Sequence, residues 1–201
     1  MYMVKPGFAK KSEAFTAAGG TFITTFFSGI VNETDLVTLG GYPGELRKLL
    51  GIWAEEIDAL PLGQYNEIVM KQPYGKLAGS YKCEMLFDLI HAEGAEVLAE
   101  YGSDFYKGMP ALTVNRFGEG KAYYVATSAD SGFMEGFLGA VCAEKGVQPL
   151  VPELPAGVEV ARRVKDGRSF LFVLNHNAES ATVRTGDVKR RDLLSGVTVD
   201  G

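Results

Sequence analysis

The sequence has few of the residues on which disulfide-stapled, metal-binding and nucleic-acid-binding proteins depend. Its 201 residues include two cysteines and two histidines, too few for a structural zinc site unless carboxylates complete it. The formal net charge of −5 gives no basic footprint for nucleic acid or an anionic membrane. No apolar run reaches transmembrane length, and the N-terminus lacks a basic segment followed by an apolar signal core. We therefore expect no metal, no cofactor, no nucleic-acid partner and no membrane partner.

The two cysteines, Cys83 and Cys142, are far apart and lie in unlike contexts. Cys83 sits in an alternating pattern typical of a strand, and Cys142 sits on an expected helix. Because free cysteine behaves as a small core residue, two buried thiols are the simplest interpretation, and a reducing, cytoplasmic setting follows from it. A disulfide, a metal site or a nucleophile are the alternatives.

One stretch divides the chain by composition. Residues 147–155 contain three prolines, and proline disfavours regular structure around it. With 46% hydrophobic and 22% charged residues, a chain of this length can bury a hydrophobic core without disulfide or metal cross-links. We predict a first domain over residues 1–147, a linker over 148–156 and a second domain over 157–201.

The first domain alternates strand and helix signals. A helix is expected after Pro6, ending at Gly19-Gly20, and the run 21–27 is apolar on both faces, as in a parallel strand covered by helices. A second helix is expected over 133–145, with Asp130 or Ser131 as its N-cap. Further strands are expected at 67–70, 82–89, 95–99, 111–114 and 121–125. This succession predicts an α/β fold with an open, mostly parallel sheet of flavodoxin-like type.

The second domain shows strand signals alone. Apolar residues alternate over 158–164, the pair Asp166-Gly167 supplies the positive φ angles of a tight hairpin, and the pattern returns over 170–174. Shorter runs at 182–184 and 192–194 continue the meander. These features predict a small antiparallel β-sandwich module.

A glycine-rich turn lies near the centre of the first domain. The chain breaks at Gly40-Gly41, turns at Tyr42-Pro43-Gly44 and continues as a short helix with Leu46, Leu49 and Leu50 on one face. Gly51 is placed to end that helix in a left-handed conformation. Such a turn can cradle an anion, but this one lacks the P-loop and dinucleotide-binding spacings. A structural loop is the favoured interpretation, and a ligand or partner contact is the alternative.

Several motifs in order carry a family resemblance. They are residues 28–35, 39–44, 49–56, 104–111, 115–125 and 172–177. Together they resemble the trimerisation domain of β-galactosidases of glycoside hydrolase family 42, with part of the C-terminal β domain. The resemblance implies a first domain with a fold like that of class I glutamine amidotransferases, assembly into a homotrimer, and a non-catalytic role. It places the catalytic glutamates in an N-terminal (β/α)₈ barrel that no part of this chain matches, so no catalytic residue carries over.

The candidate catalytic residues within the chain do not show the arrangement that either kind of catalysis requires. A retaining glycosidase needs two carboxylates facing across the scissile bond, but adjacent residues in a strand point to opposite faces, so a loop or interface pair is the favoured interpretation of Glu55 and Glu56. An amidotransferase nucleophile needs a cysteine on a sharp elbow served by a histidine, and neither cysteine has one. We interpret His91 and His176 as two histidines that do not belong to a common site. Trp53 could be a sugar platform or an interface anchor, and the resemblance favours the interface.

We therefore interpret the chain as the assembly portion of a larger enzyme that hydrolyses terminal β-galactosides by a retaining two-carboxylate mechanism. The candidate subunit interface comprises Gly40, Gly41, Tyr42, Pro43 and Trp53. The chain alone is expected to be inactive. A free-standing amidotransferase-like or carbohydrate-binding module is the alternative. The resemblance also implies that the chain starts late and stops early within its domains, with unusual edge contacts or disorder at its termini.

Overall fold

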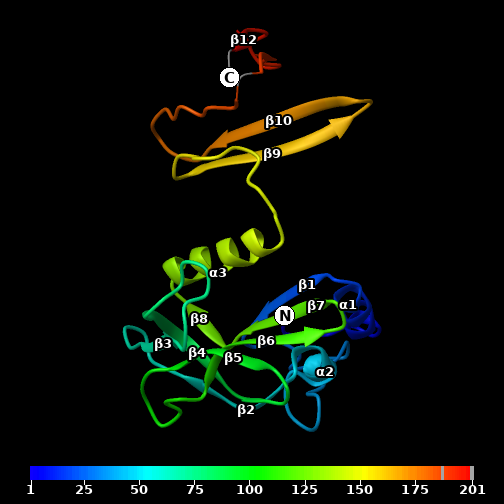
Figure 1. Cartoon of the computed structure of the whole chain (residues 1–201), viewed down its shortest axis with the longest axis vertical. Coiled ribbons are helices and arrows are strands. Elements are labelled where there is room, and N and C mark those ends of the chain that lie inside the picture. Colours follow the sequence, from blue (N-terminus) through cyan, green and yellow to red (C-terminus); the bar gives the residue numbers. More distant parts are fainter. Residues whose placement is uncertain (187, 200–201) are drawn as a thin grey trace. The chain divides into compact units, whose positions relative to one another are not determined.

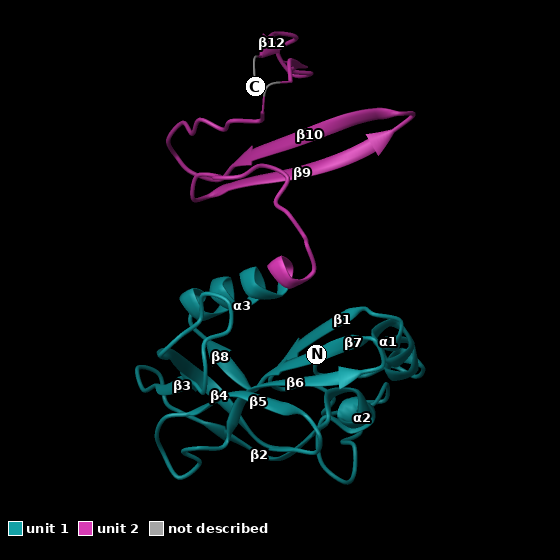
Figure 2. Cartoon of the chain, in the orientation of Figure 1, with its two compact units in different colours: residues 1–141 teal, residues 142–201 magenta. Residues whose placement is uncertain are grey.

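The computed structural model describes residues 1–186 and 188–199 (Figure 1). The chain divides into two compact units, Met1–Val141 and Cys142–Gly201 (Figure 2). The last two residues of the predicted second domain, 200 and 201, lie outside the described part. None of the described helices combines the length and the apolarity that crossing a membrane requires.

The first unit holds most of the regular structure. Its helices are α1 (Phe8–Ala17), the one-turn 3₁₀ helix η1 (Gly44–Leu46), α2 (Arg47–Leu50) and α3 (Ser131–Glu144), which runs on into the second unit. Its strands are β1 (Thr21–Thr25), β2 (Ile52–Ala59), β3 (Asn66–Met70), β4 (Ser80–Ala92), β5 (Glu96–Tyr101), β6 (Pro110–Phe117), β7 (Gly120–Val125) and β8 (Thr127–Ala129). The predicted helices and most predicted strands are confirmed, whereas β2 and β8 were not foreseen.

The eight strands form one sheet in the order β1-β7-β6-β5-β3-β4-β2, with β8 paired to β4. Among the described strand pairs of this sheet, β1 with β7 is parallel and the others are antiparallel. The prediction of a mostly parallel sheet is therefore wrong. The fold is mixed α/β with a mainly antiparallel sheet.

The lengths of the connections explain the antiparallel order. A parallel pair needs a crossover of a dozen or more residues, usually a helix, whereas an antiparallel pair needs only a tight turn. Gly118-Glu119 joins β6 to β7, and residues 71–79 join β3 to β4. Connections this short leave no room for crossover helices between these strands.

The helices cover both faces of the sheet. Neighbouring strand residues point to opposite faces, so Tyr123 and Tyr124 of β7 identify the two sides. The ring of Tyr123 contacts Phe137 of α3, with centroids 5.4 Å apart. On the side of Tyr124, Phe8 of α1 contacts Phe22 of β1, and the Asn115 amide donates to the Leu49 carbonyl of α2 at 2.8 Å. The core therefore lies in two layers, one beneath α3 and one beneath α1 and α2.

Helix ends follow their sequence signals. The Asp130 carboxylate accepts the Phe133 N–H at 2.8 Å, so the predicted cap of α3 is confirmed, and Phe133, Phe137 and Val141 form its buried stripe. Gly51 has φ +62° at the end of α2, which confirms the predicted left-handed ending.

The second unit contains two separate two-stranded sheets. Strands β9 (Val158–Lys165) and β10 (Arg168–Asn175) form the predicted hairpin, with φ positive at both Asp166 and Gly167. Strands β11 (Arg190–Arg191) and β12 (Thr198–Val199) pair with each other.

The described residues of the second unit do not form the predicted sandwich. Strands at 182–184 and 192–194 were predicted wrongly. At the second position the Asp192 carboxylate accepts the N–H groups of Leu194 and Ser195, which makes a turn in place of a strand.

Asp88 of β4 is the buried carboxyl of the first unit and is only 1% exposed. One oxygen, Oδ2, accepts the Tyr124 hydroxyl and the Phe27 N–H, the latter at 3.0 Å. The other, Oδ1, has no hydrogen-bond partner among the described residues. Burial raises the pKa of Asp88 to about 6, opposed by these two hydrogen bonds and by the amino group of Met1.

This pKa predicts a pH-dependent stability. Because the folded state holds the proton up to about pH 6 while the unfolded carboxyl releases it near its ordinary pKa of 3.8, the free energy of unfolding should fall as pH rises between these values. The difference between the two pKa values corresponds to about 3 kcal/mol. In Asp88→Asn this slope should be absent from urea titrations at pH 4 to 7. Glu84→Gln, which changes an exposed carboxyl on the same strand, should keep the slope. A full slope in Asp88→Asn would contradict the assignment.

Candidate subunit interface

The loop over residues 30–44 is held in place by backbone pairing along its length. Val31 pairs with Val37 across the loop, and the Thr38 N–H donates to the Ile30 carbonyl at 2.9 Å. At its far end, Tyr42 and Ala54 of β2 exchange both backbone hydrogen bonds, at 2.7 and 3.3 Å. The loop is therefore an ordered extension of the sheet.

Within the loop, the Asn32 side chain replaces missing backbone partners. Its carboxamide oxygen accepts from the Thr34 N–H, the Thr34 hydroxyl and the Leu36 N–H, all at 2.9–3.0 Å. Bonds of this kind fix a turn without regular secondary structure. The side chains that follow Asn32 are consequently presented from a fixed backbone.

Gly41 lies directly against the indole of Trp53. Its φ is +92°, and a Cβ placed there would be 1.9 Å from Nε1 of Trp53. The indole N–H is buried and has no hydrogen-bond partner among the described residues. Close packing against a glycine backbone, rather than a hydrogen bond, thus sets the position of the loop relative to β2.

Arg47 of α2 connects the loop to the rest of the site. Its Nε donates to Glu93 at 2.6 Å, a second nitrogen bonds the other Glu93 oxygen, and Nη1 reaches the Gly40 carbonyl at 3.3 Å. The guanidinium carbon lies 5.7 Å from the centroid of the Trp53 ring. The hydrogen bond from Arg47 lowers the pKa of Glu93, so this fork-like pair stays charged.

His91 of β4 completes the surroundings of Trp53. The two rings are stacked with centroids 5.1 Å apart, and Nε2 of His91 lies 2.8 Å from Glu55. The polar rim of Arg47, Glu93, His91 and Glu55 therefore surrounds a half-buried tryptophan. An aromatic anchor inside a polar rim is typical of protein–protein contact surfaces.

The five candidate interface residues differ in their accessibility. Gly40 is exposed, Gly41, Tyr42 and Trp53 are half-buried, and Pro43, which follows a cis peptide bond, is buried. Three exposed apolar side chains precede them in the loop, namely Leu36, Val37 and Leu39. We name these three the loop patch. Leu39, which belongs to the matched motif 39–44, is 94% exposed, and an apolar side chain presented to solvent from a fixed loop is typical of a contact surface.

The candidate catalytic groups are not brought together. Glu55 binds His91 on the surface, and Glu56 is exposed on the same strand. Both cysteines are free; Cys83 is buried, as predicted, whereas Cys142 is exposed, so the prediction of two buried thiols is wrong for it. Burial raises the pKa of Cys83 to about 12, the opposite of what a nucleophile requires. The described residues hold no group of three or more side chains suited to bind a metal ion.

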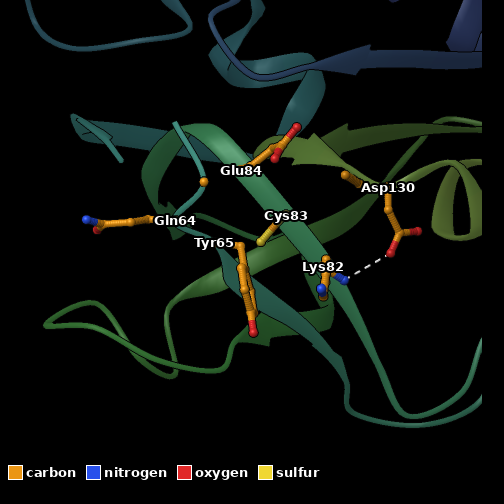
Figure 3. Close-up of a pocket in the computed structure, with 8 residues that line it drawn as sticks. Gln64, Tyr65, Lys82, Cys83, Glu84 and Asp130 are labelled. Atoms are coloured by element: carbon orange, nitrogen blue, oxygen red, sulfur yellow. Dashed lines mark hydrogen bonds between the residues drawn. The ribbon is translucent and has the colours of Figure 1, made fainter. Parts of the chain in front are cut away.

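A hollow of about 230 Å³ opens beside β4 (Figure 3). Its walls are the loop before β3, strand β4 and the start of α3; the residues are Gly63, Gln64, Tyr65, Lys82, Cys83, Glu84, Ala129 and Asp130. The ammonium of Lys82 lies 4.4 Å from the centroid of the Tyr65 ring. One face of that ring is thus already taken, which weakens the interpretation of Tyr65 as a stacking platform for a sugar.

Two family profiles match the chain along most of its length. The profile described as "Beta-galactosidase trimerisation domain" matches residues 1–148, and that described as "Beta-galactosidase C-terminal domain" matches residues 157–201.

Curated relatives and solved structures agree with these profiles. The chain is 62% identical over 201 residues to the β-galactosidase BgaA of Planococcus sp. (strain 'SOS Orange') and 44% identical over 204 residues to BglY of Alicyclobacillus acidocaldarius. Each match covers all of this chain and 30% of the relative, so the chain spans under a third of these proteins. The crystal structure of the β-galactosidase from Bacillus circulans sp. alkalophilus is similar with a TM-score of 0.92 and 64% identity, covering 100% of this chain and 30% of that one.

The contact between Gly41 and Trp53 can be tested with a matched pair of variants. Gly40 and Gly41 both have positive φ, but a Cβ on Gly40 would meet nothing within 4 Å. Gly40→Ala should lower the free energy of unfolding by about 1–2 kcal/mol from backbone strain alone. Gly41→Ala should lower it by about 2–4 kcal/mol, because overpacking against the indole adds to the strain.

Trp53 is the one tryptophan of the chain, so its fluorescence reports this contact directly. Denaturant titrations followed by that fluorescence measure both variants. The emission maximum of the folded protein should shift in Gly41→Ala and stay in place in Gly40→Ala. Equal losses of stability with unchanged emission would show that the two residues are not packed as described.

Proposed function

The chain belongs to the β-galactosidases of glycoside hydrolase family 42, whose trimerisation and C-terminal domains it matches, and from this we propose that it serves subunit assembly in such an enzyme. The observation that carries the proposal is the ordered loop that presents Leu39 to solvent beside the Trp53 anchor. Gly40, Gly41, Tyr42 and Trp53 shape this surface, and the buried Pro43 supports it from within the protomer.

The chemistry of the whole enzyme is assigned outside this chain. We propose that the parent enzyme cleaves terminal β-galactosides with two carboxylates in its barrel, by a retaining mechanism, in the cytoplasm. The names of the relatives support the substrate class. In this chain Glu55 is engaged with His91, which is consistent with a structural role for the acidic pair.

The limits of the domains are also a proposal. We place the first domain at 1–147 and the second at 157–201, with a linker at 148–156, which the two matched ranges support. We retain flavodoxin-like as the description of the first domain on the support of the parallel pair β1–β7 with α1 preceding β1.

The assembly role predicts self-association of the 201-residue chain. At micromolar concentration, light scattering should give a mass that rises toward three copies. Leu39→Asp should lower the association constant at least about tenfold, because burying an unpaired charge at a contact is unfavourable. Leu138→Asp, an exposed leucine on α3, is the matched control and should associate like the unaltered chain. A constant monomer mass up to high concentration would refute the proposal.

The non-catalytic role predicts that the chain has no β-galactosidase activity. Purified protein incubated with a chromogenic β-galactoside should release product no faster than buffer, because Glu55 and Glu56 do not face each other across a cleft. Glu55→Gln and Glu56→Gln serve as controls for trace activity. Turnover that either substitution abolishes would show that the chain carries its own catalytic carboxylate.

A further inference from the structure

A trimer with threefold symmetry needs contacts between two different surfaces of neighbouring protomers. Cyclic assemblies other than dimers use heterologous contacts, in which one surface of a protomer meets a different surface of its neighbour. If the loop patch is one of these surfaces, the same protomer carries a second surface that receives it. This step rests on the proposed function.

Within the described part of the first unit, large exposed apolar side chains also occur on three segments that hydrogen bonds join. They are Leu62, Tyr65, Met85 and Phe105, which we name the receiving patch. Leu62 is fully exposed and Phe105 is 72% exposed. Apolar side chains that are exposed singly need no explanation, but a contiguous group marks a contact surface.

Three segments bring the receiving patch together. The Leu60 N–H donates to the Met85 carbonyl at 3.2 Å, which joins the loop before β3 to β4. The Asn66 carboxamide exchanges hydrogen bonds with the backbone of Ser103 at 2.9 and 3.0 Å, which joins the same loop to the segment that carries Phe105. These bonds make the receiving patch a single ordered surface.

Backbone strain points the receiving patch outward. Met85 has φ +73° and lies in the irregular stretch of β4 between Glu84 and Phe87, where the register with β8 shifts. Asp104, which precedes Phe105, has φ +68°. Left-handed conformations at residues other than glycine are unfavourable and mark functional positions, and bulges redirect side chains. The exposed apolar side chain is Met85 itself in the first case and Phe105, the residue after Asp104, in the second.

The location of the receiving patch suits a head-to-tail contact. Figure 1 shows β3, which follows Leu62 and Tyr65, on the left of the first unit, and α2, which follows the loop patch, on its right. The hollow beside Tyr65 and Glu84 adjoins the receiving patch and offers a recess for a protruding side chain (Figure 3). Two surfaces at separate ends of one domain let each protomer of a ring contact both neighbours.

We propose that the receiving patch, formed by Leu62, Tyr65, Met85 and Phe105, binds the loop patch of a second copy of this chain in a heterologous contact. The occupant is a copy of the same chain because the matched domain is described as one for trimerisation and because the contacts of a threefold ring join two different surfaces of neighbouring copies.

The first test compares single substitutions in the 201-residue chain. Leu62→Asp and Phe105→Asp should each raise the dissociation constant of self-association about tenfold to thirtyfold in sedimentation experiments, as Leu39→Asp does. Leu138→Asp should leave it unchanged. Because Leu62 is fully exposed, its substitution tests the contact without affecting the core, and circular dichroism with thermal unfolding verifies the fold of every variant.

The decisive test mixes two defective variants. A Leu39→Asp copy keeps its receiving patch, and a Phe105→Asp copy keeps its loop patch, so a mixture can form one intact contact. We expect a one-to-one complex of two copies in the mixture, no closed trimer, and monomers for each variant alone at the same concentration.

The possible outcomes separate the two proposals. If Leu39→Asp disrupts association while Leu62→Asp and Phe105→Asp do not, the assembly role stands and the receiving patch is refuted, with another segment or partner as its occupant. If both kinds of variant are monomeric and the mixture is monomeric as well, the pairing of these two surfaces is wrong. A monomeric unaltered chain refutes the assembly role, and the receiving patch with it.

Discussion

The packing of the Gly41 backbone against the indole of Trp53 determines where the surface loop lies. Because no side chain intervenes, the loop comes close enough for Tyr42 to pair with Ala54 and for Arg47 to reach the Gly40 carbonyl. The arrangement uses backbone geometry and van der Waals contact more than polar bonding, since the indole N–H itself is unpaired among the described residues. A loop fixed in this way can present apolar side chains to a neighbour with little loss of conformational entropy on binding.

The mainly antiparallel sheet is well suited to this task. Short connections join neighbours such as β3 with β4 and β6 with β7, so the sheet is a rigid base from which loops extend. Asp88 lies inside this base and links β4 to β7 through Tyr124 and to the chain after β1 through Phe27. A carboxyl with one unpaired oxygen in the core is a cost to stability that local hydrogen bonding only partly offsets. Strand β4, which carries this carboxyl, pairs with β2, the strand on which the loop is positioned.

The sequence allowed the elements of the first unit to be predicted better than their arrangement. Periodicity located α1 and α3, and the Asp130 cap and the Gly51 ending followed from local chemistry. Residues 21–25 do form the expected parallel pair, as β1 with β7, but the same direction was predicted wrongly for the other strands, because the short connections between neighbouring strands favour antiparallel pairing. Strand β2 escaped notice because Glu55 and Glu56 interrupt its alternation at the bulge between Ala54 and Glu56.

For the candidate site, the glycines and Trp53 could be identified from the sequence, but exposure could not. Pro43 is buried because its carbonyl packs against Gly29, a residue fourteen positions earlier in the chain. Leu39 is exposed because the two glycines after it turn the backbone away from the core. The burial of Pro43 depends on a contact between distant segments, which a pattern in the sequence does not record.

The contrast between the two cysteines has a practical consequence. Cys83 is sealed inside the sheet, whereas Cys142 lies exposed on α3, at the boundary along the chain between the first unit and the second. A maleimide dye would therefore attach to one defined position in the folded chain. In a ring of copies, dyes at this position would report the spacing of three equivalent points.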